Sequence, residues 1–271
     1  MKFITASSGK LVELGQLQRP NAGRQAVSTG LDGLDQLLGG AGLVRGAVHE
    51  LLHPVDSAGP MFLAMLLARA SCLPISDPSV LPASAIGGPS SFAPAFAKQL
   101  AEETQEEQGV IVISDPAGQL YPPAAAQLGI PLSRLYLLHP KNRADELWAI
   151  CECLGSAGVS AVVASLGRLS QLEARRLQLA AERNGSMGIF IRPAGQVSNV
   201  YAAATRLLVI PQPADASCRC WNIQLVHGHG ALAGQSVFLE YNRETHSLRA
   251  FTELADRKNA AATTLRFRAI A

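Results

Sequence analysis

The chain has 271 residues, of which 48% are hydrophobic and 16% charged, which is enough apolar material for one large α/β domain and too few charges for a mostly disordered chain. A net charge of +2 excludes a general attraction to nucleic acid, so any DNA contact requires a local basic patch. Five cysteines fit reduced thiols, and the N-terminal stretch has no apolar run for a signal peptide or membrane span, so we expect a cytoplasmic protein without a membrane partner.

The first stretch of the chain, residues 1–25, is polar and aperiodic, which predicts a flexible N-terminal arm before a core domain at 26–250. Leucines with helical spacing follow at 31–38. We expect Thr29 to cap this helix and Asp35 to lie on its solvent-exposed face. A Gly-Gly pair ends the predicted helix, and a Gly-rich turn leads from it into an apolar strand.

A strand, a tight turn and a buried helix come next. The apolar run Val48–Leu52 predicts the strand, residues 53–59 the turn, and Met61–Ala70 a helix that is apolar on nearly every side. This is the structural context that a phosphate-binding loop requires.

The chemistry of a phosphate-binding loop is missing from this turn. Gly59 fits the second glycine of the pattern G-x-x-x-x-G-K-[ST], but Pro60 and Met61 stand where Lys and Ser or Thr are required. Pro60 also removes a backbone N–H donor. The sequence therefore predicts the scaffold of a nucleotide-binding domain without its phosphate and Mg²⁺ ligands.

The remainder of the core alternates between strand and helix patterns. Residues 71–91 are rich in Ser, Pro and Gly and predict a surface insertion, and 92–108 predict a helix with an acidic, solvated face. Continuous apolar runs then predict buried strands at 110–113, 134–138, 159–163 and 186–191, with helices at 122–128, 142–154 and 169–184. This alternation indicates a mainly parallel sheet covered on both faces.

After Pro193 the connections become too short for crossover helices. Strands are predicted at 204–210, 218–226 and 235–241, and they should pair antiparallel. The C-terminal tail, residues 251–271, is interpreted either as flexible or as a segment that orders on a partner.

The order of these elements resembles the RecA ATPase core, and several strings resemble the ImuA family of RecA-like proteins from bacterial mutagenesis cassettes. The resemblance rests on Arg45–Glu50, Gly118–Tyr121, Asp145–Trp148, Ala174–Glu182 and Ala202–Arg206. It implies an α/β RecA-like three-layer sandwich with a mainly parallel twisted sheet and an antiparallel C-terminal extension. It also implies a role beside RecA, an ImuB-like polymerase homologue and an error-prone replicative polymerase, with single-stranded DNA left open as a further partner.

The resemblance to RecA also implies where catalytic groups should lie. Ala164 stands where a Mg²⁺ carboxylate is expected, and Arg192 with Pro193 where a γ-phosphate sensor is expected. Asp115 is the available carboxylate near the place of the catalytic Glu. The degenerate nucleotide site then comprises His53, Asp56, Ser57, Gly59, Pro60, Met61, Asp115 and Ala164. We expect no catalytic residues, no ATP hydrolysis and no cofactor, although backbone N–H groups of the turn leave weak ATP binding open.

Two further groups of residues invite a binding role. The densest basic stretch contains Arg168, Arg175, Arg176, Arg183 and Arg192. It is interpreted either as a solvated helix face paired with nearby glutamates or as a contact with DNA or an acidic partner. The pairs Cys218/Cys220 and His227/His229 match no standard zinc module, so no metal is expected.

The sequence thus predicts a non-catalytic RecA-like accessory factor in SOS-type DNA damage tolerance. It would link RecA or damaged DNA to an error-prone translesion polymerase assembly. Two alternatives stay open at this point. One is a non-standard, DNA-stimulated ATPase using Lys141, Arg143 or a neighbouring subunit, and the other is a cell-division inhibitor.

Overall fold

The computed structural model describes residues 2–5, 26–54, 59–72, 109–196, 203–228, 233–252 and 264–266. Within them one sheet runs in the order β1-β6-β5-β7-β8-β4-β9-β10-β11-β12-β13. Its parallel part comprises β1 (Lys2–Thr5), β6 (Leu135–His139), β5 (Val110–Ser114), β7 (Val159–Ser165), β8 (Met187–Pro193), β4 (Ala47–His53) and β9 (Thr205–Gln212). Its antiparallel part continues through β10 (Cys218–Gly228), β11 (Ser236–Asn242), β12 (Ser247–Phe251) and β13 (Thr264–Arg266).

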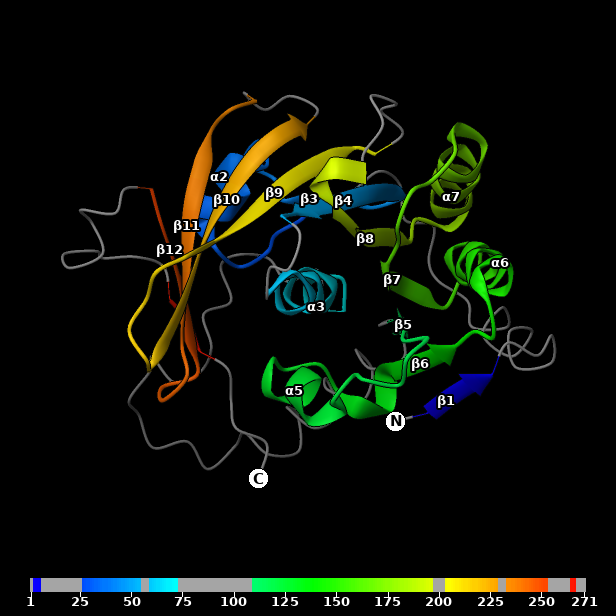
Figure 1. The fold of residues 1–271 in the computed structure, drawn as a ribbon, viewed down its shortest axis with the longest axis horizontal. Helices are drawn as coiled ribbons and strands as arrows, with labels where there is room; N and C mark the ends of the chain where they lie inside the picture. The colour runs from blue at the N-terminus through cyan, green and yellow to red at the C-terminus, as the bar shows by residue number, and fades with distance from the viewer. Residues whose placement is uncertain are drawn as a thin grey trace, which may run out of the picture.

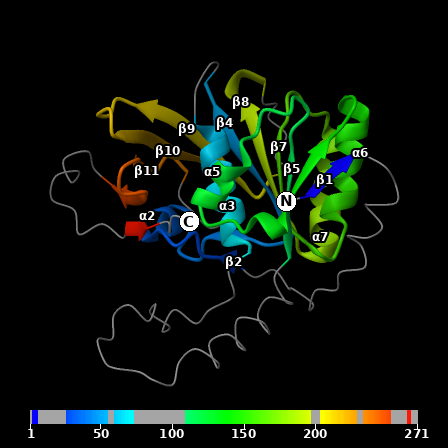
Figure 2. The ribbon, with the colours of Figure 1, turned by 90° about the horizontal axis from the view of Figure 1, so that it is seen from below.

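Helices cover both faces of the parallel part, and each face has its own hydrophobic core (Figures 1 and 2). One core includes α3 (Pro60–Ala70) and residues of α5 (Pro122–Gln127), and the other includes α6 (Arg143–Leu154) and α7 (Gln171–Asn184). The short helix α2 (Asp32–Leu37) packs against β11 and β12. The predicted fold class, a three-layer α/β sandwich with an antiparallel C-terminal extension, is confirmed. In the part of the chain that the structure describes, no helix has the length and apolar character needed to cross a membrane.

On the α6–α7 face, the predicted cap of α6 and the predicted end of α7 match the structure, whereas α7 begins at Gln171, two residues after its predicted start. The side chain of Asn142 accepts a hydrogen bond from the backbone N–H of Asp145, so it caps α6 as expected. Helix α7 ends at Gly185, whose φ of 68° is readily adopted only by glycine. These helix ends could be predicted from the sequence because a capping side chain and a terminal glycine act within a single turn of the helix.

The cap predicted for α2 is wrong. Leu31 occupies the N-cap position, and no side chain caps the helix there. Thr29 instead donates to the carboxylate of Asp35, through its backbone N–H at 2.8 Å and its hydroxyl at 2.7 Å. Ser28 donates to the same carboxylate at 2.5 Å. Asp35 therefore lies buried and holds the chain that enters the helix, rather than facing solvent.

The two ends of the chain differ from the predicted arm and tail where the structure describes them. Residues 2–5 form β1, which pairs in parallel with the β6 strand, so a loose arm is wrong for these four residues. Phe251 ends β12, and β13 pairs with β12. A small second sheet of β2 (Ala26–Val27) and β3 (Leu43–Val44) was also not predicted. The rest of the arm, the tail and nearly all of the 71–91 insertion lie outside the described residues.

A buried histidine in β4 makes the stability of this fold depend on pH. The Nε2 atom of His49 lies 2.9 Å from the carbonyl of Val44, and burial lowers the pKa of His49 to about 4. The unfolded chain therefore binds more protons below pH ~6.5. We expect the free energy of unfolding to fall by about 3 kcal/mol between pH 6.5 and pH 4. Urea titrations across this range should show that a His49→Gln variant loses most of the slope; equal slopes would contradict the prediction.

Candidate functional site

The strand–turn–helix of the predicted nucleotide site lies at the centre of the sheet. Strand β4 pairs with β8 on one side and β9 on the other, and α3 begins directly after Gly59 with Pro60 as its first residue. His53 and Met61 flank the turn, whereas Asp56 and Ser57 lie outside the described residues. That this turn is a degenerate phosphate-binding loop stays a prediction.

Aromatic side chains pack against the start of α3. The indole of Trp221, on β10, is buried against Gly59, and Phe62 stacks on it with the ring centroids 5.3 Å apart. Tyr241 also packs against Phe62, with the ring centroids 4.9 Å apart. Burial raises the pKa of the Tyr241 phenol. The backbone at the first turn of α3, which attracts phosphate in a nucleotide-binding domain, is therefore in contact with an aromatic cluster.

The remaining residues of the predicted site have local structural partners. Asp115 is buried, and its carboxylate accepts hydrogen bonds from the backbone N–H groups of Gln119 and Leu120 at 3.0 and 2.8 Å. Ala164 is buried inside β7. The carboxylate of Asp115 thus holds the loop after β5, and none of these contacts points to a reacting group.

A second carboxylate at this edge of the sheet was missed. Glu146, on α6, is buried and accepts a hydrogen bond of 2.7 Å from the Ser114 hydroxyl at the end of β5. It shares the buried face of its helix with Ala149, Ile150 and Cys153. That i, i+3, i+4 spacing was the signal that could have revealed a charged residue on an apolar face.

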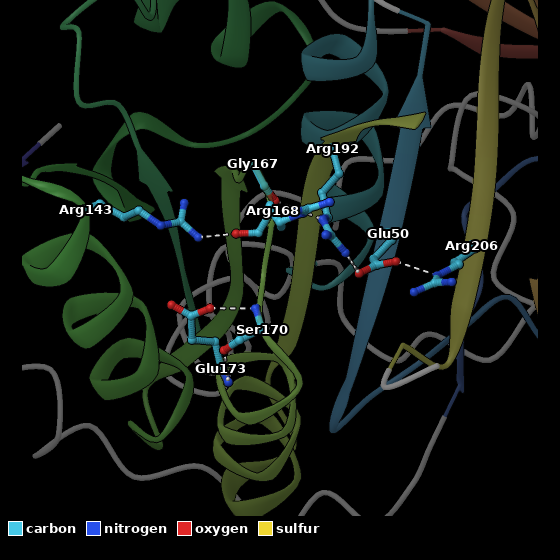
Figure 3. Close-up of polar contacts among 8 residues, drawn as sticks. All are labelled: Glu50, Arg143, Gly167, Arg168, Ser170, Glu173, Arg192 and Arg206. Carbon is cyan, nitrogen blue, oxygen red and sulfur yellow. Dashed lines mark hydrogen bonds and ion pairs between the residues drawn. The ribbon is translucent and has the colours of Figure 1, made fainter. Parts of the chain in front are cut away.

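The central strands are linked by a buried network of two arginines and one glutamate (Figure 3). Glu50 on β4 accepts from Arg192 on β8 at 2.5 Å and from Arg206 on β9 at 2.6 Å. Arg192 also donates from Nε to the carbonyl of Gly167 at 3.2 Å. The prediction that Arg192 contacts DNA or a partner is therefore wrong, because its side chain is 3% exposed. In the sequence, the only sign of this network was that charged residues stand at positions 50 and 206 inside otherwise apolar strands.

The loop between β7 and α7 is held by neighbouring elements (Figure 3). Arg143 donates to the carbonyl of Arg168 at 2.5 Å, and Arg192 donates to Gly167. The side chain of Ser170 accepts from the backbone N–H of Glu173, whose carboxylate accepts in turn from the N–H of Ser170 at 2.7 Å. This capping box fixes where α7 begins.

The capping box at the start of α7 can be tested by a small substitution. The carboxylate of Glu173 accepts a hydrogen bond from the backbone N–H of Ser170, and this bond is the main reason that the pKa of Glu173 lies below its ordinary value. We expect Ser170→Ala to lower the free energy of unfolding by about 1 kcal/mol at pH 7. Urea denaturation measures this loss, and the exposed neighbour Gln171→Ala serves as the control. Because the pKa is lowered, the contribution of Glu173 should disappear as the pH falls through it.

The other four predicted contact arginines are exposed. Arg168 lies in the loop before α7, and Arg175, Arg176 and Arg183 lie on α7 itself. The glutamates expected to pair with them have other partners. Glu173 belongs to the capping box, and Glu182 accepts from the side chain of Gln178 at 3.0 Å. The interpretation as a solvated helix face is supported in part, because the charge of Arg176 still contributes to lowering the pKa of Glu173, three residues earlier.

Strand β10 carries three of the four residues considered as metal ligands. Cys218, Cys220 and His227 all lie on this strand, while His229 lies outside the described residues. Among the residues that the structure describes, no group of three or more His, Cys, Asp or Glu side chains could hold a metal ion.

Comparison with known proteins identifies relatives of this chain. No family model matches it. Two curated proteins named Protein ImuA, from Caulobacter vibrioides strain NA1000 / CB15N and strain ATCC 19089 / CIP 103742 / CB 15, are each 27% identical to it over 187 residues. The match covers 62% of this chain and 77% of each relative. The resemblance that the sequence motifs carried is thereby confirmed: the chain is similar to the ImuA proteins over these 187 residues.

Proposed function

We propose that this chain is a non-catalytic, RecA-like accessory factor of SOS-type DNA damage tolerance in the cytoplasm. It would connect RecA or damaged DNA to an error-prone polymerase assembly that contains an ImuB-like protein and a replicative polymerase. The similarity to the ImuA proteins supports the part of the proposal that places this chain in DNA damage tolerance. The packing of Trp221 and Phe62 at the start of α3 carries the non-catalytic part of the proposal.

The physical argument concerns positioning and charge. Phosphoryl transfer requires groups that bind the phosphates, coordinate Mg²⁺ and orient water around the transferred phosphoryl. At the corresponding places this chain has Pro60 and Met61, and the carboxylate of Asp115 is occupied by two backbone N–H groups. A fold retained without these groups is suited to presenting surfaces to other proteins.

Nucleotide binding separates this proposal from the ATPase alternative. A fluorescent ATP analogue with Mg²⁺, with and without single-stranded DNA, should show no saturable binding up to millimolar concentration. Micromolar binding, or ATP turnover that disappears in Asp115→Asn, would favour the ATPase. The Asp115 variant needs a folding control by circular dichroism, because its carboxylate holds the loop after β5.

Pull-down of purified partners tests the accessory role, for which we propose that both chain ends contribute contacts. A C-terminal truncation should begin after Thr252, because Phe251 is buried and stacks on Phe238 at 5.6 Å. An N-terminal truncation of residues 1–25 removes β1 and leaves β6 as the edge of the sheet. We expect these truncations to weaken capture of RecA and of the ImuB-like protein. Unchanged capture of both by the doubly truncated chain would refute the role of the ends.

A further inference from the structure

Helices α6 and α7 lie side by side on one face of the sheet (Figure 1). An open groove lies between their C-terminal parts. The groove has a volume of 490 Å³, and its lining includes Cys151 and Glu152 from α6 with Arg176, Leu179 and Arg183 from α7. At its far end the side chain of Asn184 donates to the carbonyl of Gly155, which joins the two helices. The walls of the groove are therefore regular helices held at fixed spacing.

Large apolar side chains are exposed on the two helices that form this groove, and one of them, Leu179, lines it. Among the residues that the structure describes, the exposed large hydrophobic ones are Tyr121, Trp148, Leu172, Leu179 and Val226. Three of them belong to these two helices: Trp148 on α6 is 46% exposed, and Leu172 and Leu179 on α7 are 62% and 47% exposed. Exposed large apolar side chains on two neighbouring helices are typical of a protein-binding surface.

The apolar residues alternate with cations along one stripe of α7. Positions 172, 176, 179 and 183 are three or four residues apart, so Leu172, Arg176, Leu179 and Arg183 lie above one another on the helix surface. No ion pair within 4.0 Å involves Arg175, Arg176 or Arg183 in the described part of the chain, and Glu152 is the sole carboxylate in the groove lining. The stripe thus places two exposed arginines next to exposed leucines, and Glu173 balances part of the charge of Arg176.

We propose that this α6–α7 surface docks an acidic amphipathic helical segment of a partner protein. This inference rests on the proposed function and names the surface and the chemistry of the partner. Leucine-like side chains at i, i+3/4 and i+7 of the segment would cover Leu172 and Leu179, and carboxylates between them would pair with Arg176 and Arg183. The exposed leucines favour a peptide over nucleic acid, because phosphates and bases leave aliphatic side chains without an apolar partner.

A synthetic peptide tests this directly. The probe is a fluorescein-labelled helical 20-residue peptide, with Leu at i, i+4 and i+7 and Glu at intervening positions, whose anisotropy is measured with the full chain. We expect Arg176→Glu with Arg183→Glu to weaken its binding at least tenfold, and raised salt to weaken binding to the unaltered chain. The matched control reverses two exposed arginines on the antiparallel part, Arg243→Glu with Arg249→Glu, and should change affinity less than twofold.

Two further measurements locate the bound peptide. Trp148 and Trp221 are the two tryptophans of the chain, and Trp221 is buried, so a blue shift of emission on binding should disappear in Trp148→Phe. A Lys-for-Glu version of the peptide should not bind. Equal binding of the acidic peptide to the unaltered and charge-reversed chains, or no binding to either, would overturn the proposal.

A labelled 20-nucleotide single-stranded DNA tests whether this surface binds nucleic acid instead of a peptide. The surface is a nucleic-acid site, and the proposal fails, under three conditions taken together. The oligonucleotide binds the unaltered chain, it does not bind the Arg176/Arg183 variant, and the peptide does not bind the unaltered chain. The proposed function is judged separately by nucleotide binding and by partner pull-down. Failure of the peptide with intact pull-down would overturn this surface alone, whereas ATP turnover would overturn the non-catalytic function alone.

Discussion

Replacing Glu50 with alanine should lower the free energy of unfolding by about 3–5 kcal/mol. The carboxylate is buried between Arg192 at 2.5 Å and Arg206 at 2.6 Å. Its removal leaves two guanidinium groups at the centre of the sheet without the counter-charge that compensates their desolvation. Chemical denaturation followed by circular dichroism measures the loss.

The effect should spread beyond the strands that carry the network. Arg192 also donates to Gly167, in the loop that leads into α7, so a displaced guanidinium loosens that loop as well. We expect amide hydrogen exchange in residues 166–170 to accelerate in Glu50→Ala more than in β5, which β7 separates from the three strands of the network.

Two variants separate the buried charge from other causes. Glu244→Ala removes a carboxylate in an exposed turn and should change stability by less than about 0.5 kcal/mol. A triple variant, Glu50→Leu with Arg192→Met and Arg206→Met, removes all three charges together and should recover most of the loss, because buried ion networks are often replaceable by apolar groups of similar volume. A loss below about 1 kcal/mol in Glu50→Ala would mean that water reaches the network.

Much of the fold could be predicted because its signals are local. Continuous apolar runs such as Val110–Ser114 indicated buried parallel strands, and Asn142 and Gly185 marked helix ends within one turn. Strand β1 could not be found this way, because a four-residue strand forms only where the edge of β6 supplies its hydrogen bonds. For the same reason the short β2–β3 pair was missed.

The buried polar residues, in the candidate site and outside it, were harder to predict because only their partners in the fold show that they are buried. Arg192 looks like a surface cation in the sequence, and only the fold brings Glu50, 142 residues earlier, against it. The carboxylate of Asp35 faces inward because Ser28 and Thr29 fold back on it. Burial of a charge is decided by such partners, which local periodicity does not report.

Trp221 shows the same limit at the predicted nucleotide site. The sequence indicated that the groups for phosphate and Mg²⁺ were missing, but it did not indicate what fills the space beside the helix. That information comes from β10, which returns antiparallel to β9 and carries the indole to Gly59, 162 positions earlier in the chain. The missing ligands and the aromatic packing are therefore independent observations on one place in the fold.

Replacing Gly59 with alanine should lower the free energy of unfolding by roughly 2–6 kcal/mol. The φ of Gly59 is +118°, a region that residues with a Cβ rarely adopt. A Cβ at this position would also overlap Nε1 of Trp221 and lie 2.8 Å from its Cε2. Backbone strain and overpacking therefore add at one position, and urea denaturation measures their sum.

A matched glycine isolates the part of this loss that comes from Trp221. Gly40 has a similar φ of +90° but open space around its Cα, so Gly40→Ala should cost only the backbone strain, about 1–3 kcal/mol. In a Trp221→Ala background the Gly59 substitution should approach the cost of the Gly40 substitution, because the clash is gone. If Gly59→Ala were as mild as Gly40→Ala in the unaltered chain, the indole would not rest against Gly59 in solution. The first turn of α3 would then be open to phosphate, and the ATPase alternative would gain the support that the aromatic packing now denies it.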